Sequence, residues 1–294
     1  MIKIAMLGCD SSHTEAYSQL LHTQSSPFWG KAKINWLWGE NHQQAQDKAK
    51  KNDIPYVCES VQQAVSEADL VLVSGRYGDS HIEPAKIAIT KGKPTYIDKP
   101  LTNDYSQAKD IAKIAKESGS SVMSCSPLRF SKEILALKKQ IPDISSLESG
   151  VFTGPAFTNA IPDPRSKKLH FYASHAADLM CSFFGSNTFS LVTSQTSLGI
   201  WATITYANGI IANLNLPLEV DEHYHVCLYS KNQTMATNID PWGNFYETTM
   251  AVILDELYHG DCRRAPFQEA LCGIQILDGI ETSLKTKGKI KLHD

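Results

Sequence analysis

A lysine follows a short apolar strand in the stretch "GKPTYIDKPLT", residues 92–102. The strand ends on Asp98, so Lys99 would stand at the carboxyl edge of a parallel sheet, where ligands bind in such sheets. A lysine there can give or take a proton at a reacting hydroxyl or carbonyl group, particularly where desolvation lowers its pKa. Pro100 biases Lys99 away from helical backbone angles. Taken alone, the stretch is equally compatible with a Lys-Pro turn that has no chemical role.

A second group of chemically capable side chains lies in "HFYASHAADLM", residues 170–180. His175 and Asp178 are three positions apart, which places both on one face if the segment is helical. His170 and Tyr172 lie just upstream. The alternative for an isolated pair of this kind is a helix capped by Ser174, with a histidine that is hydrogen-bonded in the core.

The third candidate is the loop "LGCDSSHT", residues 7–14, which follows an apolar strand and precedes a helical stretch. A nucleotide-binding protein has its glycine-rich phosphate loop at this position. Here only Gly8 is a glycine, and it still allows a tight turn out of the strand. Asp10 and His13 occupy positions at which glycines are expected, and Asp10 would bring a carboxylate toward two phosphates unless it turns away or is neutralised.

Two serines in this loop fit a phosphate. Ser11 and Ser12 can donate hydroxyl hydrogen bonds, and the N-terminus of the following helix offers its N–H groups. The alternative is that Ser12 or Asp10 is simply the helix cap.

Further candidates for dinucleotide binding follow the second and fourth strands. Glu40 could accept the ribose hydroxyls, and because no arginine follows it, NAD is favoured over NADP. Arg76 and Tyr77 could flank the adenine or the pyrophosphate, or they belong to a surface loop.

The elements that must position these residues follow a regular order. Over the first 124 residues, strand and helix patterns alternate strictly, and "DLVLVSG" (69–75) is a nearly continuous apolar run, typical of a strand buried on both faces. This alternation predicts a parallel, doubly wound sheet. Beyond about residue 130 the pattern is rich in strands, with "YANG" as a hairpin turn, and helices are expected at about 245–258 and 266–284. We therefore predict an α/β protein, with a Rossmann-type dinucleotide-binding domain at 1–124 and an α+β domain with a mostly antiparallel open sheet at 125–294.

Composition narrows the class of protein. The chain has 294 residues, a formal charge of −3 and seven cysteines without a CxxC pair. The charge gives no reason to expect nucleic acid or an anionic membrane as a partner. The cysteines resemble reduced thiols, and no apolar run approaches the ~20 residues of a membrane span. We expect a soluble cytoplasmic protein.

Possible metal ligands are few. Cys9, Asp10 and His13 lie in one loop, which supplies too few obvious partners. His223 and His225 alternate on a strand and could bind zinc, but a solvated surface explains them better. We predict no metal site.

The order of these motifs resembles that of the Gfo/Idh/MocA family of nicotinamide-dependent oxidoreductases. The resemblance is strongest over residues 81–102, where the family has a Glu-Lys-Pro sequence and this chain has Asp98-Lys99-Pro100. "SPLRF" (126–130) is similar to the family's "NxRF" stretch, which places Arg129 near the substrate. "SHAADL" is similar to the family's HxxDL helix, which places His175 in the active site and Asp178 behind it.

The resemblance implies hydride transfer at a CH–OH group of a sugar, polyol or related small molecule, with NAD(P) as the cofactor. Lys99 and His175 would handle the hydroxyl proton, while Asp98 and Pro100 would lie on the cofactor side. The second domain would supply substrate contacts and the interface of a homodimer or homotetramer.

One departure from the family leaves alternatives open. An aspartate usually stands four residues before the helix histidine, where this chain has Phe171; His170 or Tyr172 could substitute for it. The alternatives are a non-catalytic binding or regulatory protein on the same fold, and a lyase or glycosidase-like enzyme that uses NAD transiently. In the loop 158–170, Arg165, Lys167 and Lys168 could meet an acidic sugar, although exposed lysines are the commoner explanation.

Overall fold

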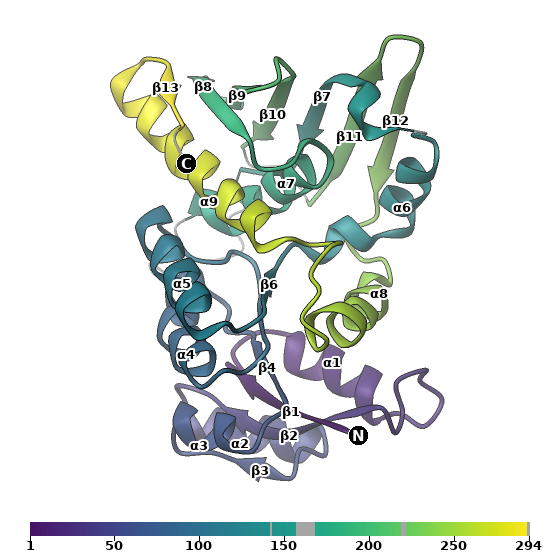
Figure 1. Cartoon of the computed structure of the whole chain (residues 1–294), viewed down its shortest axis with the longest axis vertical. Coiled ribbons are helices and arrows are strands. Elements are labelled where there is room, and N and C mark those ends of the chain that lie inside the picture. Colours follow the sequence, from purple (N-terminus) through teal and green to yellow (C-terminus); the bar gives the residue numbers. More distant parts are fainter. Residues whose placement is uncertain (142, 157–167, 219–221, 293–294) are drawn as a thin grey trace. The chain divides into compact units, whose positions relative to one another are not determined.

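The chain forms two compact units (Figure 1). The computed structural model describes residues 1–141, 143–156, 168–218 and 222–292. The first unit comprises Met1–Thr102, Ser106–Ser124 and Tyr246–Phe267, and the second comprises Asn103–Tyr105, Cys125–Phe245 and Gln268–Asp294. Residues Tyr246–Phe267, which lie beyond the expected boundary after residue 124, are part of the first unit.

The first unit is built on a six-stranded sheet in the order β3-β2-β1-β4-β5-β6. Every neighbouring pair is parallel, so the predicted doubly wound sheet is confirmed. The order reverses between β1 and β4, and ligands bind at such a switch point. The strands are β1 (Ile2–Leu7), β2 (Ala32–Trp38), β3 (Tyr56–Val57), β4 (Leu70–Val73), β5 (Thr95–Ile97) and β6 (Val122–Ser124).

Helices connect these strands. All four residues of β4 are buried, which agrees with its continuous apolar sequence. The helices of this unit are α1 (His13–His22), α2 (His42–Lys51), α3 (Val61–Ser66), α4 (Gly78–Thr90), α5 (Tyr105–Ser118) and α8 (Phe245–Val252), which continues as the π-helical turn η3 (Ile253–Leu257). The helices expected at about 245–258 and 266–284 are α8 with η3 and, in the second unit, α9 (Phe267–Thr286), and their bounds differ by one or two residues. Helix ends depend on local capping contacts that periodicity does not report.

The second unit contains a seven-stranded sheet in the order β12-β11-β7-β10-β9-β8-β13. All neighbouring pairs are antiparallel except β7 with β10, as predicted for a mostly antiparallel sheet. The predicted hairpin at "YANG" joins β9 to β10. The strands are β7 (Leu147–Thr153), β8 (Thr188–Gln195), β9 (Gly199–Tyr206), β10 (Ile211–Pro217), β11 (Tyr224–Ser230), β12 (Thr234–Ile239) and β13 (Ile290–Lys291).

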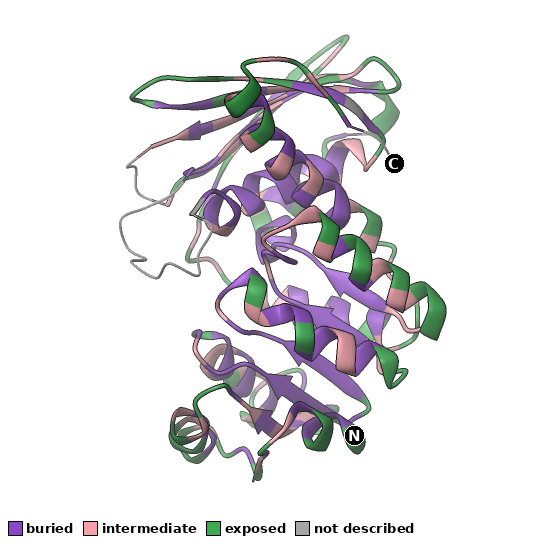
Figure 2. Ribbon diagram, turned by 90° about the vertical axis from the view of Figure 1, so that its left-hand side faces the viewer, coloured by how far each residue is buried: buried purple, intermediate pink, exposed green. Residues whose placement is uncertain are grey.

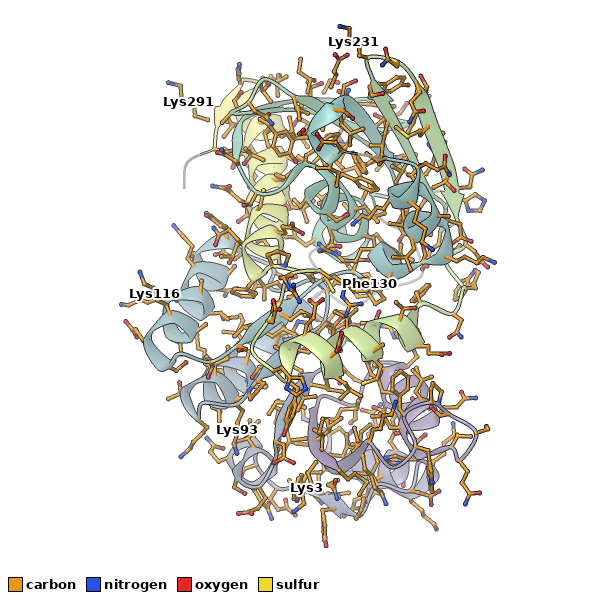
Figure 3. All side chains as sticks on the ribbon, turned by 45° about the vertical axis from the view of Figure 1, so that its right-hand side comes forward. Lys3, Lys93, Lys116, Phe130, Lys231 and Lys291 are labelled. Carbon is orange, nitrogen blue, oxygen red and sulfur yellow. The ribbon has the colours of Figure 1, made fainter. Side chains whose placement is uncertain are left out.

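Helices cover one face of this second sheet, and the other face carries exposed and half-buried side chains (Figure 2). The alternating burial along β10 and β11 is what a sheet with one covered face requires. The helices of the unit are the 3₁₀ turns η1 (Pro127–Phe130) and η2 (Ile144–Ser146), with α6 (Lys132–Lys139), α7 (Lys168–Phe184) and α9 (Phe267–Thr286). Figure 3 shows Lys116 and Lys231 pointing away from the ribbon, as solvated lysines do.

Candidate functional site

The turns after β1 and β4 touch each other at the switch point of the first sheet. Gly8 has a φ of 106°, and a Cβ there would lie 2.3 Å from the backbone nitrogen of Gly75. The Ser74 hydroxyl donates to the Gly8 carbonyl at 3.1 Å. A side chain at position 8 would break this contact, so the glycine is required by both the backbone angle and the close approach. The turn leads directly into the N-terminus of α1, the arrangement that binds phosphate groups.

The Asp10 carboxylate is bound within this pair of turns. Its Oδ1 accepts the backbone N–H of Arg76 at 2.9 Å. Asp10 therefore has a backbone donor from the turn after β4, which offsets part of its charge. Arg76 makes this contact through its backbone N–H, whereas the prediction from the sequence concerned its side chain.

Ser11 stabilises the loop from the inside. Its hydroxyl donates to the Ser74 carbonyl at 2.9 Å and accepts the His13 N–H at 3.3 Å. Ser12 occupies the N-cap position of α1 without a side-chain cap hydrogen bond, and Asp10 binds Arg76 instead. Ser12 is therefore the N-cap residue without capping through its side chain, and Ser11 accepts the first N–H of the helix.

A lysine that the sequence analysis missed also holds the loop. Lys48 of α2 donates to the Ser11 carbonyl at 2.6 Å and to Glu15 Oε2 at 2.9 Å. It lies on a polar helix whose pattern indicates only a solvated face. Contacts between separate elements have no local sequence signal, so Lys48 could not be singled out.

His13 is buried among polar groups from four parts of the first unit. Its Nδ1 lies 2.9 Å from the Ser11 hydroxyl, and its Nε2 lies 3.4 Å from Asp98 Oδ2 and 3.3 Å from the Tyr246 hydroxyl. The ring also contacts the rings of Tyr17 and Tyr246. Because Ser11 gives its one proton to Ser74, Nδ1 of His13 must be the donor to Ser11.

The surroundings of His13 shift its pKa in opposite directions. Burial lowers the pKa of His13, Asp98 acts in the opposite direction, and Lys99, His81 and Lys48 lower it further. Asp98 is itself buried, and its Oδ1 has no hydrogen-bond partner among the residues that the structure describes. His13 thus favours the neutral form and lies beside Asp98, one of whose carboxylate oxygens has no hydrogen-bond partner among the described residues.

Lys99 follows β5 at the carboxyl edge of the sheet and is half-buried. The Lys99–Pro100 peptide bond is cis. The buried ring of His81 lies between two turns, with Nδ1 at 2.9 Å from the Pro100 carbonyl and Nε2 at 2.7 Å from the Gly75 carbonyl. His81 therefore ties the turn that contains Lys99 to the turn after β4, a role that the sequence did not indicate.

Glu40 lies just beyond β2 and is exposed. At the preceding residue, a Cβ on Gly39 would lie 2.3 Å from the Cys9 sulfur, so this thiol fills the space between the ends of β1 and β2. Burial raises the pKa of Cys9 to about 11, which keeps the thiol neutral. The first unit thus brings Gly8, Asp10, Ser11, Ser12, His13, Glu40, Arg76, Asp98, Lys99 and Pro100 to turns at the carboxyl ends of its strands.

In the second unit, His175 lies on α7 and is half-buried. Its Nδ1 lies 2.6 Å from the hydroxyl of Ser126, which directly precedes η1. The edge of its ring meets the Tyr224 ring at a centroid distance of 5.2 Å. Tyr172 is buried on the same helix, three residues before His175. Ser126 was not among the predicted site residues, and its "SPLRF" context pointed only to Arg129.

Arg129 and Asp178 form a buried ion cluster. Arg129 Nε and Nη2 donate to the two carboxylate oxygens of Asp178 at 2.9 and 2.7 Å, and Nη1 donates to Glu269 at 2.8 Å. Desolvation disfavours the charged guanidinium, but Asp178 and Glu269 outweigh it and raise the pKa of Arg129. The Arg129 side chain is 1% exposed, and its place near the substrate stays a prediction.

His170 of α7 contacts α9. Its Nε2 is 3.0 Å from Asp278 Oδ1 and its Nδ1 is 3.7 Å from Glu281, both on α9, and its side chain is fully buried. The described contacts do not place it with the partners of His175. Ser174 is inside α7 and donates to the Phe171 carbonyl, so the alternative of a cap at Ser174 is wrong. Arg165 and Lys167, and the side chain of Lys168, lie outside the described residues.

Comparison with known proteins finds likeness in sequence over the first part of the chain. Residues 2–125 match the family model described as "oxidoreductase family, NAD-binding Rossmann fold". The uncharacterized oxidoreductase YhhX of Escherichia coli (strain K12) is 30% identical over 115 residues, which are 37% of this chain and 33% of that protein. The chain thus matches about a third of the length of this relative.

Solved structures share the fold over the whole length. A myo-inositol dehydrogenase from Lactobacillus casei, in complex with NAD(H) and myo-inositol, gives a TM-score of 0.83 at 13% identity and covers 100% of this chain and 97% of that chain. A myo-inositol dehydrogenase from Corynebacterium glutamicum gives 0.83 at 14% identity, with 100% and 99% covered. The TM-scores show that the fold is shared, and at identities this low they show nothing about the reaction.

Within residues 1–141, 143–156, 168–218 and 222–292, no helix combines the length and the apolar character that crossing a bilayer requires. Nor do three His, Cys, Asp or Glu side chains gather there as a metal centre would need.

Proposed function

Residues 2–125 of this chain belong to the Gfo/Idh/MocA family of oxidoreductases, and from this premise we propose that the protein transfers hydride between NAD and a CH–OH group of a sugar, polyol or related small molecule. The family's description as NAD-binding supports the cofactor. The fold shared with two myo-inositol dehydrogenases supports the substrate class.

The observation that carries this proposal is the contact between Gly8 and Gly75. A phosphate loop needs a backbone without side chains at the point where the sheet order reverses, next to a helix N-terminus. Gly8 meets that requirement although the loop lacks the other glycines, because the turn is held by Ser11, Ser74 and Lys48 instead. The residues present therefore fit a dinucleotide, and Asp10 does not oppose it, since its carboxylate binds a backbone N–H.

When bound, NAD supplies the hydride acceptor or donor. Lys99 is proposed to exchange the proton of the reacting hydroxyl, for which its place at the end of β5 is suited. His175 is proposed to hydrogen-bond a substrate oxygen and to stabilise the charge that develops on it. Glu40, after β2, is proposed to accept the ribose hydroxyls, which favours NAD over NADP.

The second unit is proposed to contact the substrate and to form a homodimer or homotetramer. Support for an interface comes from the uncovered face of its sheet, where the apolar side chains of Val192, Trp201 and Ile211 are exposed by 45%, 37% and 46%. Light scattering of the purified protein tests this, and a monomer at all concentrations would contradict it.

The decisive experiment compares NADH and NADPH as ligands. At 100 times its dissociation constant, a ligand should stabilise the folded protein by about 2.7 kcal/mol, which a thermal shift reveals. Turnover is then sought with NAD and a panel of polyols and sugars, including inositols, by nicotinamide absorbance. Lys99→Met should abolish turnover and leave NADH binding unchanged, whereas Lys91→Met, at an exposed position after α4, should alter neither.

Two outcomes would replace the proposal by an alternative. Absence of a shift with every nicotinamide form would favour a binding or regulatory protein. Turnover without net change in nicotinamide absorbance, with cofactor held through purification, would favour an enzyme that uses NAD transiently.

A further inference from the structure

His13 occupies a position at which a dinucleotide-binding loop usually has a glycine, and it is the first residue of α1. Its imidazole is buried within the first unit. The charge of an imidazole changes near neutral pH, so the chain has a titratable group at a helix N-terminus of the kind that phosphates approach. The hydrogen bonds of the ring indicate where it would gain a proton.

The contacts of the Ser11 hydroxyl account for the proton on Nδ1 of His13. This hydroxyl has one proton and two lone pairs, and the Ser74 carbonyl, which can only accept, lies 2.9 Å away. With its proton given to Ser74, the hydroxyl accepts Nδ1–H of His13 at 2.9 Å and the backbone N–H of His13 at 3.3 Å. Nδ1 is therefore protonated in both charge states of the ring, and only Nε2 can gain a proton.

On its other side the ring faces a carboxylate. Nε2 lies 3.4 Å from Asp98 Oδ2 and 3.3 Å from the Tyr246 hydroxyl. Asp98 is itself buried, and its Oδ1 has no hydrogen-bond partner among the described residues. In the neutral ring Nε2 is an acceptor, so it gives no hydrogen bond to this carboxylate. A proton on Nε2 would convert two facing acceptors into a charge-assisted pair.

The remaining surroundings oppose that proton. Burial lowers the pKa of His13 most, and nearby cations lower it further, while Asp98 raises it. The titratable and charged groups that contact the ring or act on its charge are Tyr17 of α1, Lys48 of α2, His81 of α4, Asp98 and Lys99 after β5, and Tyr246 of α8. Of these groups, Asp98 is the one that favours the imidazolium, so one further negative charge near the ring would shift the balance toward it.

The pyrophosphate of a dinucleotide has such a charge, and the loop of Gly8, Ser11 and Ser74 leads it to the N-terminus of α1 in the proposed function. We propose that binding of NAD(H) is coupled to uptake of a proton from the solvent by Nε2 of His13, and that the imidazolium donates to Asp98 and attracts the pyrophosphate. The inference rests on the proposed function, because it needs a phosphate at this loop. It assigns to His13 a role in binding that a glycine at this position could not have.

Proton uptake is measured by isothermal titration calorimetry of NADH at pH 7 in buffers that differ in ionisation enthalpy. The observed enthalpy should vary linearly with that ionisation enthalpy, with a slope that corresponds to about half to one proton taken up per NADH. Because the complex binds more protons than the free protein, the affinity should fall as the pH rises, by up to about tenfold per pH unit. NADH that binds with a slope of zero would overturn the inference.

Three variants identify the group that takes up the proton. His13→Gln should bind NADH without proton uptake and with an affinity that no longer varies with pH, and uptake equal to that of the parent protein would overturn the inference. Asp98→Asn removes the carboxylate that favours the imidazolium and should also reduce the uptake, which provides a second test if His13→Gln does not fold. His259→Gln, at an exposed position of the same unit, should keep the parental uptake.

The outcomes separate this inference from the proposed function. NADH binding without proton uptake would refute the inference and leave the proposed function in place. The absence of binding by every nicotinamide form would refute the proposed function, and the inference with it.

Discussion

The two units hold their buried charges in opposite ways. In the second unit, the Arg129 guanidinium meets both oxygens of Asp178 and also Glu269, so the cluster has its hydrogen bonds made internally. In the first unit, Asp98 meets His13 at 3.4 Å and has a second oxygen that no described residue binds. Asp98 and Asp178 are 2% and 7% exposed, so burial alone does not distinguish these two carboxylates.

The difference separates a cluster whose charges are bound within its unit from one that has a carboxylate oxygen that no described residue binds. A buried charge whose partners are all in place is costly to disturb. Burial lowers the pKa of His13, which lies near Asp98, so the protonation of His13 can change when a charged group approaches. Arg129 was predicted to lie near the substrate and Asp98 on the cofactor side, and both assignments stay predictions.

The largest effect is expected from removing the cation of the closed cluster. Arg129→Met leaves the buried Asp178 and the half-buried Glu269 without their partner, which should lower the free energy of unfolding by about 3–5 kcal/mol. Urea denaturation measures it. The control is Lys132→Met, whose side chain is 85% exposed beside Glu133 and whose loss should cost about 0–1 kcal/mol. Equal costs for the two variants would mean that the cluster is no more than a surface ion pair.

A smaller loss is expected at the turn of the first unit. Gly8→Ala adds a Cβ against Gly75 and forces a non-glycine residue to positive φ, at a cost of roughly 2–4 kcal/mol, and should abolish NADH binding. Gly209→Ala in the β9–β10 hairpin is the matched change, because Gly209 has a φ of 90° but open space around it. It should cost about 1–2 kcal/mol and leave NADH binding intact. NADH binding to Gly8→Ala at parental affinity would exclude the turn as the phosphate loop.

The smallest effect is a change in the pH dependence of stability. Burial lowers the pKa of His13 below its ordinary 6.5, so the folded protein binds this proton less readily than the unfolded chain. The stability due to neutral His13 is therefore present above pH 6.5 and is lost as the pH falls through the lower, folded pKa. His13→Gln should flatten the fall in unfolding free energy on acidification, measured by urea denaturation at a series of pH values. His259→Gln, at an exposed position, serves as the control, and a parallel slope in His13→Gln and the parent protein would contradict the prediction.

Much of the fold could be read from local patterns. The continuous apolar run of β4, the strand–helix alternation and the hairpin between β9 and β10 depend on residues close in sequence, and all three are confirmed. The same holds for the place of Lys99, because a short apolar run followed by Asp-Lys-Pro marks a strand end.

The sequence by itself therefore determined the class of fold, the loop after β1 and the elements that hold Lys99 and His175. Only the tertiary structure decided their partners: Ser126 is 49 residues from His175, Glu269 is 140 from Arg129, and Tyr246 is 233 from His13. Strand and helix patterns arise from contacts within a few residues, whereas a proton's position depends on which distant donor or acceptor the packing brings within about 3 Å. For that reason the residue types indicated a candidate site, whereas the fold alone decided which distant donors and acceptors surround each of its side chains.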